Sequence, residues 1–167
     1  MAGGRWARIG DVFEIRTSRG LAYAQYIDEH AAPPRFGSLI RMLPGFYDER
    51  PKAFEPLVQQ PHVFMVFFPL NAAIRRNIVQ RVANVPVPPN LREFPVFRCG
   101  ATNPATGRIH DWWLWDGKKE WRVGTLTPEQ RSFPIRQIVN DTMLIIMIEH
   151  GTAANQGRGE MKDEFSE

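Results

Sequence analysis

Residues 11–28 read DVFEIRTSRGLAYAQYID, and this stretch indicates the fold class most clearly. Two runs rich in β-branched and aromatic residues, 11–17 and 21–28, flank the turn Ser18-Arg19-Gly20, which predicts an antiparallel hairpin. With Gly20 in the left-handed conformation, Thr17 would lie opposite Leu21. Alternation along the strands then predicts one face made of Glu14, Arg16, Ala22 and Ala24, and a core face made of Phe13, Ile15, Leu21, Tyr23 and Ile27.

The other extended segments are short, because 14 prolines and 13 glycines interrupt the chain. We predict a third strand over residues 36–43. A continuous apolar run over residues 62–68 predicts a strand that is covered on both faces and lies in the middle of a sheet. Residues 79–85 are expected to be extended. Residues 139–149 contain the run MLIIMI and are predicted to form a last, buried strand.

Helical signals are limited to three short stretches. Prolines interrupt residues 46–61, so at most one or two turns fit around residues 52–59. Residues 70–77 place apolar side chains at helical spacing. Further on, Thr127 and Gln130 have the spacing of a capping box, and Pro134 ends the predicted helix within two turns.

These elements predict an α+β, β-rich fold: an SH3-like hairpin at the start of a twisted, mostly antiparallel sheet or partly open barrel, with one or two short helices. We expect residues 1–150 to form a single domain. Residues 151–167 lack apolar periodicity and are predicted to be a flexible C-terminal tail.

The composition is that of a globular protein, with 43% hydrophobic and 23% charged residues in a chain of 167. The longest apolar runs are far shorter than the roughly 18 residues of a membrane-spanning helix. The N-terminus lacks the apolar stretch of a secretory signal. A single cysteine, Cys99, cannot form an intramolecular disulfide. We therefore expect a cytoplasmic protein without membrane contact.

The sequence gives little support to catalysis. The four histidines, His30, His62, His110 and His150, lie at four separate element ends and lack a metal-binding spacing. A hydrolase site assembled from His110, Asp111, Asp116 and Glu120 is the weaker alternative to ordinary turn and strand-edge roles. Cys99 is most simply a small buried side chain. We predict no enzyme activity, no metal and no cofactor.

Tryptophan is concentrated in residues 111–123, DWWLWDGKKEWRV, which predict a second hairpin. Asp116-Gly117 favours a two-residue turn; a four-residue loop would shift the partners and keep the faces. The predicted core face holds Trp112, Leu114, Trp121 and Val123. The predicted partner-binding face holds Asp111, Trp113, Trp115, Glu120 and Arg122, two indoles among charges as in an interface hot spot. Alternatively, a loop such as residues 46–61 covers both indoles.

Several motifs in fixed order resemble the immunity protein 26 family of bacterial polymorphic-toxin systems. They are GDVFEI, YAQYI, WWLWDG, LTPEQRSFPI, IVND and LIIMIEHG, and the resemblance spans residues 9–151. The resemblance implies a small cytosolic protein that binds and neutralises a cognate toxin without catalysis. It supplies no binding motif that can be transferred residue by residue.

Two functions of different classes follow from the sequence. The first is a toxin-neutralising immunity protein, with a cognate toxin as its partner. The alternative is a nucleic-acid-binding SH3-like module that stacks bases on aromatic side chains. Nucleic acid is the less favoured partner, because the net charge is only +3 and Arg75, Arg76 and Arg81 form the only local basic cluster. The sequence leaves the oligomeric state open.

Overall fold

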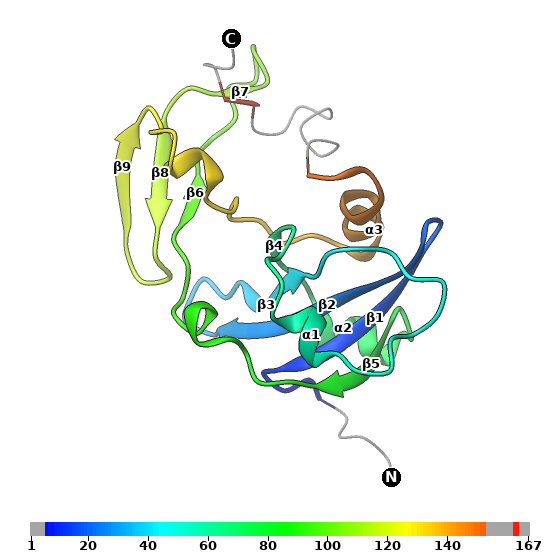
Figure 1. Cartoon of the computed structure of the whole chain (residues 1–167). Helices are drawn as coiled ribbons and strands as arrows, with labels where there is room; N and C mark the ends of the chain where they lie inside the picture. Colours follow the sequence, from blue (N-terminus) through cyan, green and yellow to red (C-terminus); the bar gives the residue numbers. More distant parts are fainter. Residues whose placement is uncertain (1–5, 153–161, 164–167) are drawn as a thin grey trace.

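The computed structural model describes residues 6–152 and 162–163. Its largest element is a five-stranded antiparallel sheet in the order β4-β3-β2-β1-β5 (Figure 1). The strands are β1 (Asp11–Thr17), β2 (Gly20–His30), β3 (Gly37–Met42), β4 (Met65–Phe67) and β5 (Val79–Asn84).

A second, three-stranded antiparallel sheet has the order β6-β8-β9. It consists of β6 (Phe97–Cys99), β8 (Trp112–Trp115) and β9 (Glu120–Gly124). A further pair of two-residue strands, β7 (Arg108–Ile109) and β10 (Lys162–Asp163), is parallel. The predicted α+β, β-rich class with mostly antiparallel pairing is confirmed. The predicted tail lies largely outside the described residues.

The helices are short. They are α1 (Glu55–Val58), α2 (Leu70–Arg75), α3 (Asp141–His150) and the 3₁₀ turns η1 (Pro89–Leu91) and η2 (Gln130–Ser132). The predicted capping box is confirmed, because the Thr127 main-chain N–H donates to Gln130 Oε1 (2.9 Å) and the Gln130 N–H donates to Thr127 Oγ1 (3.2 Å). In the part of the chain that the structure describes, none of the helices has the length and hydrophobicity of a membrane-spanning segment.

The first hairpin forms, but the predicted register is wrong by one residue. Thr17 lies opposite Gly20 and Arg16 opposite Leu21. The Thr17 hydroxyl donates to the Gly20 carbonyl (2.7 Å), and Gly20 has φ +117. Phe13 and Ile15 therefore share a core with Ala22, Ala24 and Tyr26, whereas Leu21 and Tyr23 pack on the opposite face.

Two further predictions need correction. Of the strand predicted at residues 62–68, only β4 (Met65–Phe67) forms; it is buried as expected, but Val63 is exposed and β4 lies at the edge of the five-stranded order. Its outer side is covered at Phe67, whose N–H donates to the Gln137 carbonyl (3.2 Å) and whose carbonyl accepts from the Val139 N–H (3.0 Å). Residues 139–149 are mostly the helix α3 rather than a strand, because Asn140 caps the N-terminus by accepting from the Met143 N–H (2.8 Å).

The hydrophobic cores follow from this arrangement. Helix α3 packs Leu144 and Met147 onto one face of the five-stranded sheet, and α1 packs Leu57 and Val58 onto the other. A third core lies between the two sheets, where side chains of β2, β3 and β4 meet β6 and β8. It contains Ile27, Leu39, Met65, Phe67, Val87, Phe97, Cys99 and Trp115.

Residues 134–139, here named the bridging segment, connect the two sheets by main-chain hydrogen bonds. Its first half pairs with β6, since the Arg98 N–H donates to the Pro134 carbonyl (2.9 Å) and the Arg136 N–H donates to the Arg98 carbonyl (3.0 Å). Its second half pairs with Phe67 of β4. In Figure 1 it runs from the three-stranded sheet towards α3. The relative position of the sheets is therefore fixed at their junction.

Candidate binding surface on the three-stranded sheet

The tryptophan hairpin closes through a four-residue loop, so the expected two-residue turn is wrong. Trp115 lies opposite Glu120 and Trp113 opposite Arg122. Asp116 closes the loop, because its Oδ1 accepts from the main-chain N–H groups of Lys118 and Lys119 (both 2.9 Å). These two bonds also lower the pKa of Asp116. The loop length changes by two, so the predicted faces are kept.

The predicted core face of this hairpin is confirmed. Trp112 and Leu114 are buried and pack with Ile109 and Leu126 in a small separate core. Trp121 and Val123 are partly buried against the same cluster. A register shift between Trp112 and Trp113 brings Trp112 opposite Gly124.

The predicted exposure of Trp115 is wrong. Its side chain is only 6% exposed, because this part of the face packs against the five-stranded sheet. The Trp115 ring centroid lies 4.8 Å from that of His30, 4.9 Å from that of Phe36 and 5.5 Å from that of Phe94. Trp115 is therefore covered by the end of β2 and by the segments that follow β2 and η1, and not by the 46–61 loop of the alternative interpretation.

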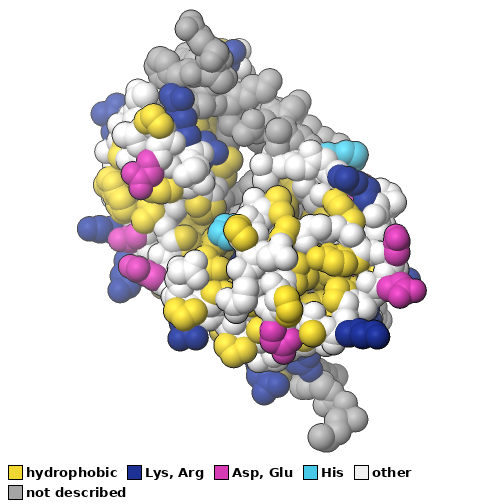
Figure 2. Space-filling model, viewed as in Figure 1, with side chains coloured by type: hydrophobic (Ala, Val, Ile, Leu, Met, Phe, Trp, Pro, Cys, Tyr) yellow, Lys and Arg dark blue, Asp and Glu magenta, His cyan; other side chains and the backbone are white. Residues whose placement is uncertain are grey.

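Trp113 remains at the surface, with 37% of its area exposed. Charged pairs lie along the same face. Arg122 Nε donates to both carboxylate oxygens of Asp111, at 2.8 and 2.9 Å, which raises the pKa of Arg122. Arg136 of the bridging segment forms an ion pair with Glu120 through Nη1 and Oε1. In Figure 2, hydrophobic side chains over this sheet lie among basic and acidic ones.

Arg136 is the residue that sequence reasoning missed. Its guanidinium carbon lies 5.1 Å from the centroid of the Trp115 ring and 5.4 Å from that of the Phe36 ring. The cation therefore covers the buried aromatic cluster on one side and holds Glu120 on the other. The sequence gives no signal for this contact, because Arg136 reaches the hairpin through the pairing of the bridging segment with β6.

A hollow of about 340 Å³ lies beside Trp113, and we name it the Trp113 hollow. Its volume is at the lower end of the about 300–1,000 Å³ of small-molecule sites, so it suits one side chain or a similarly small group. A Cβ on Gly100 would lie 2.6 Å from Ile109 Cγ2 and 2.9 Å from the Asp111 carbonyl oxygen, so the close packing against these two residues requires glycine at position 100. The lining residues are Cys99, Gly100, Ala101, Trp113, Glu120 and Arg136.

The Cys99 thiol contributes no charge to this hollow. The side chain is 5% exposed, and burial raises its pKa above the ordinary value of a thiol, although the nearby Arg136 acts in the opposite direction. A neutral thiol is a poor nucleophile. The chemistry that the hollow can offer is therefore recognition by the indole, the carboxylate and the guanidinium.

The residues of the alternative hydrolase site have separate partners. His110 Nε2 lies 2.8 Å from Thr106 Oγ1, Asp116 closes the hairpin loop, and Asp111 and Glu120 pair with different arginines. His30 Nε2 lies 2.9 Å from the Gly117 carbonyl oxygen and so joins the first sheet to this loop. In the described part of the chain, no group of three or more His, Cys, Asp or Glu side chains is placed to hold a metal ion.

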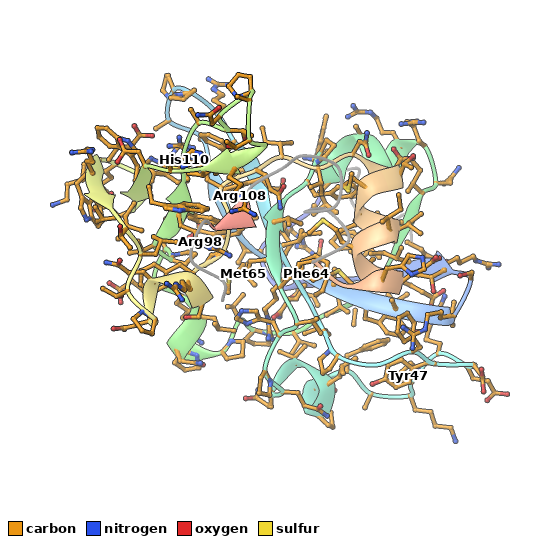
Figure 3. The ribbon with its side chains drawn as sticks, turned by 90° about the horizontal axis from the view of Figure 1, so that it is seen from above. Tyr47, Phe64, Met65, Arg98, Arg108 and His110 are labelled. Atoms are coloured by element: carbon orange, nitrogen blue, oxygen red, sulfur yellow. The ribbon has the colours of Figure 1, made fainter. Side chains whose placement is uncertain are left out.

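A larger hollow, of about 670 Å³, lies at the junction of β4, the bridging segment and α3. Val63 and Ile138 are exposed beside it, at 59% and 55%. Burial and the charge of Arg41 lower the pKa of His62 at its margin. Figure 3 shows Phe64 and Met65 near the centre of the molecule, with Arg98 on the side of the three-stranded sheet. Met143 and Met147 of α3 also line this hollow.

Comparisons of the chain with protein-family models, with curated proteins and with solved structures give no match. Of the five residues predicted for partner binding, four remain at or near the surface of one sheet: Asp111, Trp113, Glu120 and Arg122. Trp115 belongs to the core instead, and Arg136 joins the four surface residues.

Proposed function

We propose that the protein is a cytoplasmic immunity protein, which binds one cognate bacterial toxin and neutralises it without catalysis. The observation that carries this proposal is the partly exposed Trp113 on a face with two ion pairs. Tryptophan and arginine are the side chains most enriched among residues that dominate binding energy in protein interfaces.

The surroundings of Trp113 suit a preformed binding surface. Cys99 lies opposite it on β6 and Arg122 opposite it on β9, so the indole stands on the middle strand of the sheet. Side chains held by a rigid sheet lose little conformational entropy on binding. The Asp111–Arg122 pair is exposed at the margin, where charges contribute more to orientation and specificity than to affinity.

The motif order described above also supports the proposal. GDVFEI and YAQYI fall on β1 and β2, WWLWDG on β8 and its loop, and LTPEQRSFPI on η2 and the bridging segment. IVND and LIIMIEHG contain the cap and the body of α3. The resembling motifs thus include the exposed indole of Trp113 and both ends of the bridging segment, residues 134–135 and 138–139, whereas Arg136 lies between two motifs.

The proposal predicts that an adjacent gene encodes the toxin, and the test is a calorimetric titration of the purified protein against the toxin domain of that gene. Trp113→Ala is expected to weaken binding by about 2 kcal/mol, or roughly 30-fold. Trp6→Ala is the matched control, because Trp6 is also an exposed tryptophan, at 59%. A cell assay should show loss of protection for Trp113→Ala and full protection for Trp6→Ala.

Absence of binding to the adjacent toxin would contradict the proposal. The nucleic-acid alternative makes the opposite prediction, since binding to random-sequence RNA or DNA would fall steeply with salt through counterion release. Salt-sensitive binding to such nucleic acid, weakened by Trp113→Ala, would favour that alternative.

A further inference from the structure

We infer that the Trp113 hollow receives an arginine side chain of the partner protein, stacked on Trp113 and hydrogen-bonded to Glu120. This inference rests on the proposed function, because it names the chemical group by which the toxin would be recognised. It goes further in assigning an acceptor role to Glu120 and a positioning role to Arg136.

The sheet register brings the indole and the carboxylate to the same face. Trp113 lies opposite Arg122, and Glu120 is two residues before Arg122 on β9. Glu120 is therefore a diagonal neighbour of Trp113, at a spacing of about 7–8 Å that long side chains can span. Both residues line the same hollow. A flat group between them can contact the ring and the carboxylate together.

Glu120 has capacity for another donor. Its Oε1 accepts from Arg136, whereas no donor among the described residues forms a hydrogen bond with Oε2. A carboxylate offers about four lone-pair positions. Arg136 holds Glu120 in place, because its guanidinium is itself packed over Trp115 and Phe36. The carboxylate is thus oriented before a partner arrives.

This pair exposes more of its negative charge than of its positive charge. The Glu120 side chain is 44% exposed and that of Arg136 only 22%. The Glu120 carboxylate would repel an incoming anion. It would attract an incoming cation, as would the negative face of the indole. The neutral Cys99 thiol adds no opposing charge. The hollow therefore favours a cation.

Arginine fits better than lysine for a geometric reason. Its guanidinium is planar, stacks on aromatic rings and donates several hydrogen bonds in one plane. The hollow offers one ring and one carboxylate on a shared face, and its lining at Gly100 and Ala101 carries no side chain larger than a methyl group. A lysine ammonium would be able to pair with Glu120 but would not stack on Trp113.

A first experiment needs no toxin. The probe is the peptide acetyl-Gly-Arg-Gly-amide, titrated into the full chain while the Trp113 indole N–H is followed by NMR. We expect a saturable shift at millimolar peptide, and weaker binding for the peptides with citrulline or lysine. Glu120→Gln should weaken arginine-peptide binding by about tenfold, as expected for losing a hydrogen bond to a charged group. Glu49→Gln, at an exposed glutamate in the loop after β3, should change nothing.

A second experiment uses the toxin complex. Each surface arginine of the toxin is changed to lysine and tested alone and with Glu120→Gln. The inference predicts one arginine whose replacement is strongly coupled to Glu120→Gln and to Trp113→Ala. Toxin binding that depends on Trp113 but couples to no arginine would overturn the inference and leave the proposed function standing. No toxin binding would refute the proposed function, and equal binding of arginine and citrulline peptides would refute the arginine site by itself.

Discussion

Replacing Trp115 by alanine should destabilise the protein far more than replacing Trp113, although the two residues share one strand face. Trp115 is 6% exposed, and an aromatic side chain that buries about 150–250 Å² contributes roughly 4 to 6 kcal/mol at about 25 cal/mol per Å². Large-to-small core substitutions of this kind cost about 3 to 5 kcal/mol. We therefore expect the free energy of unfolding to fall by about 4 kcal/mol for Trp115→Ala.

Trp113→Ala is the matched comparison in the same strand. Trp113 is 37% exposed, against 6% for Trp115. The difference corresponds to roughly 80 Å² of buried surface, or about 2 kcal/mol, before any cavity is counted. Urea unfolding followed by circular dichroism measures both losses, and the melting temperature of Trp115→Ala should fall by about 10 °C or more. Equal losses for the two variants would refute the assignment of one indole to the core and the other to the surface.

Three other changes test separate parts of the structure. Trp112→Ala should cost about 3 to 5 kcal/mol, because Trp112 is 1% exposed; a urea midpoint like that of the wild type would contradict its core position. Asn140→Ala should cost about 1 kcal/mol, since it removes the α3 cap, and an unchanged thermal melt would show that the cap contributes nothing. Arg50 holds the pKa of Glu14 below its ordinary 4.5, so the stability from this carboxylate is present above that value and lost as pH falls through the lowered pKa. Urea unfolding in acid should therefore show a smaller pH dependence for Glu14→Gln, and an unchanged dependence would contradict this linkage.

The sequence predicted the elements better than their register. The first hairpin was recognisable from residues 11–28, but its pairing was not, because both faces of β1 and β2 are buried. Apolar alternation restrains register only where one face is polar. Thr17 could have given the correct pairing, since its hydroxyl bonds to the Gly20 carbonyl and closes a two-residue turn.

The helix α3 was missed for a related reason. A short continuous apolar run fits a buried strand and a buried helix equally well. The deciding signals lie at its ends, where Asn140 and Asp141 begin the helix and Gly151, with φ +82, follows it. Asn and Asp at the start and Gly after the end are typical helix boundaries. These boundary residues predict the helix, whereas the apolar run between them does not distinguish it from a strand.

The binding face was predicted in part. The even loop length was enough to place Trp113, Glu120 and Arg122 on one face, and this did not depend on whether the loop has two or four residues. Burial of Trp115 depends on Phe36 and Phe94, which are distant in the sequence. Sequence periodicity distinguishes the two faces of a strand, but it does not reveal where along a face another sheet begins to cover it.

Arg136 connects this boundary with the proposed recognition of a toxin. One side of its guanidinium covers Trp115 and Phe36, which belong to the aromatic cluster between the sheets, and its Nη1 holds Glu120 beside the partly exposed Trp113. The main chain of Arg136 is fixed by its hydrogen bond to the Arg98 carbonyl (3.0 Å). The Arg136 side chain therefore has few alternative conformations, and the ion pair in turn restricts the conformations of the Glu120 side chain. A binding residue oriented in this way loses less conformational entropy when a partner arrives. The packing that stabilises the junction of the two sheets is thus also what prepares the neighbouring surface for binding.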